Sequence, residues 1–274
     1  MNKITIPTYN VQKLEREIQN GKTNPLLFQT DRGFFVVKSK DNVDGSKVLV
    51  NEFICYKLAK LLGVPIPDAA LINIDKKTIE ADQVLMKKNI SPGLHFGSEF
   101  VKKAQPSVQP PLIDIINNQE DIPSIILFDQ IIYNNDRTEN QGNLLIDLKE
   151  KRILAIDHSH PFKLGVLWNS EELSKIQKEK ICLVRDFHGQ NYRVLLRYVN
   201  GHSPFNKIRS LINGIKFEHI DWCFEQLPEE EWDLNIEDKI ALKEFIWHRI
   251  NNVEHLLLLL KDQCPNWKGG ELIE

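Results

Sequence analysis

Two carboxylates and a group of amides lie close together in the middle of the 274-residue chain. Asp136 follows an apolar segment, and Asp157 ends the apolar run RILAID; between them lie the amides Asn140, Gln141 and Asn143. A carboxylate can position an attacking hydroxyl, and an Asp with an amide supplies the oxygen ligands that suit Mg²⁺. The pattern predicts phosphoryl transfer, with Asp136 near the acceptor and Asp157 holding the metal.

The same residue types also have structural uses. Asp and Asn are common in loops, and Asp136 could form a structural ion pair with its neighbour Arg137. The combination of an apolar helix, Asp-Arg, downstream amides, a hairpin and then Ile-Asp-His favours the chemical interpretation. His158, which follows Asp157, is interpreted as a packing or hydrogen-bonding residue of the loop.

The N-terminal third offers a matching cation. Lys38 lies at the end of the apolar run FFVVK, and lysine is a common point-charge partner for nucleotide phosphates. Glu52, near the start of the next helix, is well placed to hold it, as in protein kinases. An ordinary surface lysine is the alternative. A turn containing Gly21, Lys22 and Thr23 could lay backbone N–H groups over phosphates, although the Walker A spacing is absent.

The elements that would position these residues can be predicted from periodicity. LLFQT (26–30) and GFFVVKSK (33–40), joined by a Gly-containing turn, predict a hairpin. VLVNEFICYKLAKLLG (48–63) has one apolar helical stripe and a terminal Gly. ALINI and DQVLMKK are interpreted as strands. In the second half we predict a helix at PSIILFDQIIYN, strands at NLLID and RILAID, and a helical tail over 237–264.

A proline-rich stretch divides these elements. Residues 89–123 contain five prolines and several Gly, Ser, Asn and Gln residues, which is typical of a linker. We therefore expect an α+β fold with a β-rich N-terminal part (1–88), a hinge or linker (89–123) and a mainly helical C-terminal part (124–274).

Composition excludes several classes of protein. Charged residues make up 27%, the formal net charge is −3, and no two of the four cysteines form a C-x-x-C pair. The acidic balance argues against direct nucleic-acid binding, and the cysteine spacing argues against a zinc ribbon. The longest purely apolar run, Leu256 to Leu260, is far short of the roughly 20 residues that span a bilayer. We expect a cytoplasmic protein with no membrane span.

The segment LVNEFICYKLAKLLGVPIPDAALINI, followed by FDQIIYNNDRT, NLLID and ILAIDH, resembles the bacterial HipA-like kinases, and most of all the smaller HipA-like subfamily. These enzymes are related in fold to the phosphatidylinositol 3- and 4-kinases and, more distantly, to protein kinases. The likeness runs from about Gly21 to Phe162 and continues loosely into the tail. It implies a two-lobed protein-kinase-like fold that binds ATP and Mg²⁺ in the cleft.

The resemblance also implies roles for individual residues. Lys38 would contact the α- and β-phosphates and Glu52 would orient it, while Asp136 would be the catalytic aspartate and Asp157 the principal Mg²⁺ ligand. The hinge beside adenine would be formed by Leu85, Met86 and Lys87.

The amide ligand departs from the family pattern. The family usually has an Asn five residues after the catalytic Asp, where this chain has Gln141. Asn140 and Asn143 flank it, and we favour Asn143 because it immediately precedes a strand.

The resemblance implies that the acceptor is a Ser or Thr hydroxyl of a protein, with a small alcohol or a lipid head group as the alternative. The departure at Gln141 keeps open a pseudokinase that binds nucleotide, or a scaffold, without efficient transfer.

Overall fold

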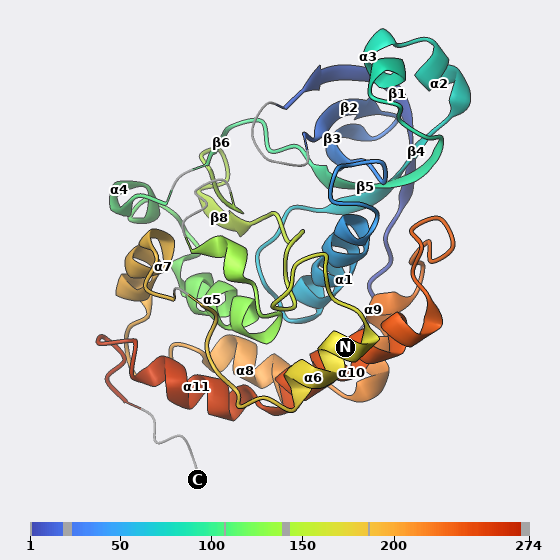
Figure 1. The fold of residues 1–274 in the computed structure, drawn as a ribbon. Coiled ribbons are helices and arrows are strands. Elements are labelled where there is room, and N and C mark those ends of the chain that lie inside the picture. Colours follow the sequence, from blue (N-terminus) through green and yellow to red (C-terminus); the bar gives the residue numbers. More distant parts are fainter. Residues whose placement is uncertain (1, 19–23, 107, 139–142, 186, 270–274) are drawn as a thin grey trace.

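Five strands of the N-terminal part form a closed barrel in the order β1-β2-β3-β5-β4 (Figure 1). The computed structural model describes residues 2–18, 24–106, 108–138, 143–185 and 187–269. Neighbouring strands are antiparallel, except that β1 and β4 run parallel where they close the barrel. The strands are β1 (Thr8–Glu17), β2 (Leu26–Thr30), β3 (Gly33–Lys38), β4 (Ala69–Ile74) and β5 (Gly93–Glu99).

The predicted hairpin is confirmed as β2 and β3. Leu26 pairs with Val37 and Thr30 pairs with Gly33, whose φ of 135° lies in the region that glycine adopts readily. Phe28, on β2, is completely buried in the barrel core. Because Lys38 is the last residue of β3, this register brings its side chain to the end of the barrel.

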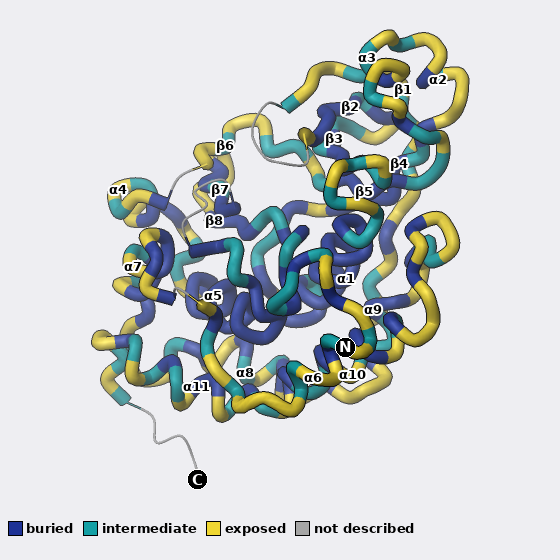
Figure 2. The backbone as a smooth tube through the Cα atoms, in the orientation of Figure 1, coloured by how far each residue is buried: buried dark blue, intermediate teal, exposed yellow. Residues whose placement is uncertain are grey.

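The predicted helix at residues 48–63 is α1 (Lys47–Leu61), and Gly63 follows it with φ +65°. The sequence suggests one apolar stripe, but every residue from Val48 to Ala59 is buried. The reason is its position: α1 lies between the barrel and the helical part and is covered on all sides (Figures 1 and 2). Polar residues on α1, Glu52 among them, therefore lie inside the molecule.

DQVLMKK is not a strand, so that prediction is wrong. These residues form the short helix α3 (Gln83–Lys87), which follows α2 (Lys76–Glu80). The side chain of Asp82 accepts hydrogen bonds from the backbone N–H groups of Val84 and Leu85, which caps the helix, and Asn89 follows it at φ +52°. Leu85 is fully buried and belongs to the core of the barrel.

The expectation of a linker throughout residues 89–123 is also wrong, because residues 93–99 are strand β5. This strand pairs with both β3 and β4, so it belongs to the barrel. Its glycines suggest a loop, but Gly97 has a packing reason: a Cβ there would lie 2.5 Å from Ile72 Cγ1. Farther along the same stretch, Ile113 is buried in the main core.

The chain after β5 contains a three-stranded sheet and helices packed beside and below it (Figure 1). The predicted strands NLLID and RILAID are confirmed as β7 (Leu144–Asp147) and β8 (Arg152–Ala155), with β6 (Ala104–Gln105) beside β7. No helix in the described part of the chain is long and apolar enough to cross a bilayer. The helices are α4 (Pro110–Ile113), α5 (Ile122–Ile131), α6 (Ser170–Gln177), α7 (Gln190–Leu195), α8 (Asn206–Ile212), α9 (Phe217–Phe224), α10 (Ile236–Asn251) and α11 (Val253–Lys261).

A buried histidine in β5 makes stability depend on pH. Burial lowers the pKa of His95 to about 4; its Nδ1 accepts from the backbone N–H of Lys40, and its Nε2 donates to the carbonyl of Ser91. Between pH 6.5 and 4 the unfolded chain binds a proton that the folded chain does not, so stability falls as pH falls. We expect a loss of about 3 kcal/mol over this window.

The test is chemical unfolding at pH 7, 6, 5 and 4 of the native protein and of His95→Gln, whose amide can accept and donate but does not titrate. The substitution should flatten the pH dependence. Some slope should remain, because burial also lowers the pKa of His158. Identical slopes for the two proteins would contradict the prediction.

Candidate functional site

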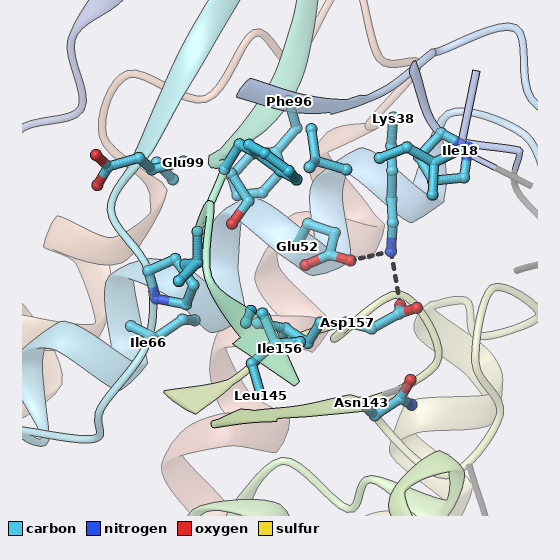
Figure 3. A pocket seen from close by; sticks show the side chains of 18 of the residues that line it. Ile18, Lys38, Glu52, Ile66, Phe96, Glu99, Asn143, Leu145, Ile156 and Asp157 are labelled. Carbon is cyan, nitrogen blue, oxygen red and sulfur yellow. Dashed lines mark hydrogen bonds and ion pairs between the residues drawn. The ribbon is translucent and has the colours of Figure 1, made fainter. Parts of the chain in front are cut away.

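A pocket of about 800 Å³ lies between the barrel and the sheet of β6, β7 and β8. That volume is in the range of small-ligand and cofactor sites. Part of the wall is apolar, and one end, called here the polar end, carries charged and amide side chains around Lys38 (Figure 3). Other charged residues also line the pocket, among them Glu99, which lies away from Lys38. The apolar wall includes Val36 of β3, Ala69 of β4, Phe96 of β5, Leu145 of β7, and Ile156.

Three charged side chains meet at the polar end. Lys38 Nζ donates to Glu52 Oε1 and to Asp157 Oδ1, the latter at 2.6 Å (Figure 3). The side chains of Lys38 and Glu52 are 11% and 8% exposed, and that of Asp157 is 30% exposed. Lys38 and Glu52 come from the barrel and from α1, whereas Asp157 comes from the turn after β8. Glu52 and Asp157, which are far apart in the sequence, therefore both contact the Lys38 ammonium group.

Lys38 and Asp157 stabilise each other in the charged form, whereas burial and the Asp157 carboxylate raise the pKa of Glu52. Burial alone would raise the pKa of Asp157, but the Lys38 ammonium and hydrogen bonds from Lys38 and Ser159 lower it below its usual value of 3.8. Burial alone would lower the pKa of Lys38, but the carboxylates of Asp157 and Glu52 raise it above 10.5. Lys38 and Asp157 therefore both stay charged from about pH 4 to 10.

A short turn holds Asp136 beside Asn143. Asp136 lies in the 3₁₀ turn η2 (Asn135–Arg137), and its backbone N–H donates to the side chain of Asn134. Asn143 Nδ2 donates to Asp136 Oδ2 at 2.8 Å and to the Asp136 carbonyl at 3.2 Å. The side-chain nitrogen of Asn143 thus points toward Asp136, and Figure 3 shows the side-chain oxygen of Asn143 on the side that faces Asp157. Asn143 therefore lies between the two carboxylates that the sequence singles out.

Comparison with known proteins places this geometry in a family. A family model described as HipA-like kinase matches residues 11–257, which is most of the chain. The chain belongs to the HipA-like kinase family. Among solved structures, the Helicobacter pylori proinflammatory kinase CtkA has a similar fold, with a TM-score of 0.58 and 12% sequence identity over 93% of this chain and 99% of that one. The comparison with curated proteins gives no match.

Sequence reasoning missed the role of Arg137 in this HipA-like kinase. Arg137 does not pair with Asp136, the alternative considered above; both its Nε and Nη2 donate to the carboxylate of Asp129. Its Nη1 donates to the carbonyls of Asn143 and Ile156, so one fully buried side chain holds the residue before β7 and the residue before Asp157. Asp129 lies eight positions earlier, near the end of α5, which stops at Ile131, and the chain then turns through Tyr133 at φ +50°. No helical spacing links the two residues, so the sequence pattern carried no signal for this pair.

His158 completes this buried network. Arg137 Nη2 lies 3.0 Å from His158 Nε2, and because a guanidinium only donates, Nε2 accepts. Burial lowers the pKa of His158 well below its usual value, so the ring is neutral. Its ring also meets that of Phe128 edge to face. These contacts confirm the interpretation of His158 as a packing and hydrogen-bonding residue.

Other predicted site residues fall elsewhere. Leu85, Met86 and Lys87 lie in α3 and do not line the pocket, so the hinge expected there is wrong. Residues 98–102, which comprise the end of β5 and the three residues after it, line the pocket instead. Backbone hydrogen bonds fix this segment, since Phe100 N donates to Phe34 O. Gly21, Lys22, Thr23, Asn140 and Gln141 lie outside the described residues.

Proposed function

We propose that this kinase transfers the γ-phosphate of ATP to a hydroxyl group in an Mg²⁺-dependent reaction, in a cleft between two lobes of a protein-kinase-like fold. The observation that carries the proposal is the contact of Lys38 with both Glu52 and Asp157 at one end of a pocket whose wall also offers an apolar surface. A cation there can neutralise phosphate charge where water is largely excluded, which is the main requirement of phosphoryl transfer.

The rest of the pocket suits the base of the nucleotide. Adenine would lie between Val36 and Ala69 on the barrel side and Leu145 and Ile156 on the sheet side. The backbone of residues 99–102 would run along its edge in place of the hinge first expected at residues 85–87. The triphosphate would then point toward Lys38, whose side chain closes the opposite end (Figure 3).

The residues present fit a magnesium ion. Asp157 and Asn143 line the same pocket and supply the oxygen donors that Mg²⁺ prefers. Within the described ranges, no group of three or more His, Cys, Asp or Glu side chains could hold a metal ion. Phosphate oxygens and water would therefore complete its shell, as is usual for Mg²⁺ in kinases. When bound, the ion would neutralise charge on the phosphates.

Asp136 would position the acceptor. Its carboxylate is half-buried and is not among the residues that line the pocket, but it accepts a hydrogen bond from Asn143, which does line it. From there it could accept a hydrogen bond from the incoming hydroxyl. We propose a protein Ser or Thr as the acceptor, as the resemblance described above implies, in preference to a small alcohol or a lipid head group.

Asp136→Asn separates transfer from binding. We expect nucleotide affinity to stay within about twofold, because Asp136 does not contact Lys38, while transfer should fall by about 10²- to 10⁴-fold. Affinity is measured with a fluorescent ATP analogue, and transfer with γ-labelled ATP and a mixture of candidate protein acceptors. An unchanged transfer rate would remove Asp136 from the reaction.

The same two measurements address the pseudokinase alternative. Its motivation is Gln141, which stands where the family has its Asn ligand. Mg²⁺-dependent nucleotide binding by the unaltered protein, with no transfer to any acceptor and no hydrolysis, would favour it. Measurable transfer would exclude it.

A further inference from the structure

The hydroxyl of Ser159 holds one oxygen of the proposed metal ligand. Ser159 Oγ donates to Asp157 Oδ1 at 2.6 Å, the same oxygen that accepts from Lys38 Nζ. Ser159 is only 2% exposed, so water competes little for this contact. Two donors on Oδ1 fix the rotation of the carboxylate and leave Oδ2 as the oxygen that can face a cation.

A second group holds Ser159 in turn. His160 Nδ1 lies 3.0 Å from Ser159 Oγ, and because the hydroxyl donates to Asp157, its oxygen accepts from the ring. The ring packs closely on Gly165, where a Cβ would lie 2.9 Å from His160 Cδ2 and φ is +67°. The position of the His160 ring therefore depends on the absence of a side chain at Gly165.

The chain of contacts ends in the loop between β3 and α1. His160 Nε2 lies 3.4 Å from Asp44 Oδ2, a buried oxygen that has no hydrogen-bond partner among the described residues. Because the ring proton lies on Nδ1, this contact is an ion pair only when the ring carries a second proton. The loop is preorganised, because the Asn42 side chain accepts from Asp44 N and donates to the Gly45 carbonyl. Hydrogen bonds therefore run from His160 through Ser159 to Asp157, and Asp44 lies beyond His160 without a hydrogen bond to it.

We propose that Ser159, supported by His160, is a positioning residue that sets the orientation of the Asp157 carboxylate for Mg²⁺. This inference rests on the proposed function, since it concerns the metal ligand of that site. Outer contacts of this kind commonly tune metal affinity without touching the metal.

A separate clamp allows this role to be distinguished from a structural one. Asn51, on α1, donates to the carbonyls of Ser159 and Gly165 at 2.7 and 3.1 Å and accepts from Trp168 Nε1 at 2.9 Å. These bonds use the backbone of Ser159 and not its hydroxyl. Removing the hydroxyl should therefore leave the segment in place while it frees the Asp157 carboxylate to rotate.

The experiment measures the stabilisation of the full chain by a non-hydrolysable ATP analogue as Mg²⁺ is titrated, for the unaltered protein and for Ser159→Ala. We expect the Mg²⁺ concentration at half-maximal stabilisation to rise about tenfold in the variant. Analogue affinity measured in EDTA should not change, because Lys38 is intact. Ser124→Ala is the matched control, because Ser124 is also 2% exposed and lies on α5, outside the pocket lining.

A second variant tests whether His160 acts through Ser159. His160→Ala alone should shift the Mg²⁺ curve in the same direction by a smaller factor, and it should add nothing in the Ser159→Ala background. A Mg²⁺ curve of Ser159→Ala that matches the unaltered protein would overturn the inference, as would full additivity of the two changes. Absence of any Mg²⁺-dependent stabilisation in the unaltered protein would instead overturn the proposed function.

Discussion

Asp157→Asn should lower phosphoryl transfer by about 10³-fold or more, the largest loss of activity that we expect from one substitution. Asparagine has the same shape, and its oxygen can still accept from Lys38 and Ser159, which hold the carboxylate now. What it loses is the negative charge that would bind the metal. A metal contribution of about 4 kcal/mol to the transition state corresponds to about 10³-fold in rate.

The measurement is the initial rate of transfer at saturating ATP over a range of Mg²⁺ concentrations. Asp68→Asn is the control, because Asp68 also pairs with a lysine, Lys60, but its side chain is 70% exposed. Both variants should retain the circular dichroism spectrum of the unaltered protein, and only Asp157→Asn should lose the Mg²⁺ dependence. A normal rate and normal Mg²⁺ dependence in Asp157→Asn would remove Asp157 from the metal site.

The features that the sequence predicted correctly are those encoded locally. The β2–β3 hairpin follows from alternation on either side of a Gly-containing turn, and α1 follows from apolar spacing and Gly63. The contact of Lys38 with Glu52 was foreseen because it joins adjacent elements and matches a known kinase arrangement. How completely α1 is buried could not be foreseen, because burial on its polar side depends on packing by distant helices.

The predictions that failed required long-range information. Strand β5 looks like a linker by composition, and its pairing with β3 and β4 is what makes it a strand. Gly97 suits that place only because Ile72 packs against it. Once β5 was missed, the hinge was assigned to the preceding segment, where Leu85 instead fills the barrel core. The Asp82 and Asn89 caps of α3 were visible in the sequence and favoured a helix over a strand.

Arg137→Met should have the largest effect on stability, lowering the free energy of unfolding by about 3–5 kcal/mol. Arg137 and Asp129 are both completely buried, so the substitution leaves a carboxylate without its cation inside the core. Tyr192 and Asn134 still donate to Asp129 but do not neutralise its charge.

The measurement is urea unfolding at pH 7, with Arg209→Met as the control. Arg209 pairs with Glu254 near the surface, so its loss should cost about 1 kcal/mol or less.

The double variant Arg137→Met with Asp129→Asn separates the two roles of the arginine. Removing the stranded charge should recover a large part of the lost stability. It should not recover phosphoryl transfer, because the carbonyls of Asn143 and Ile156 remain without the guanidinium that fixes both flanks of the proposed metal site. If stability and transfer were regained together, Arg137 would serve only to neutralise Asp129, and the alignment of Asn143 with Asp157 would have to come from the β7–β8 pairing alone.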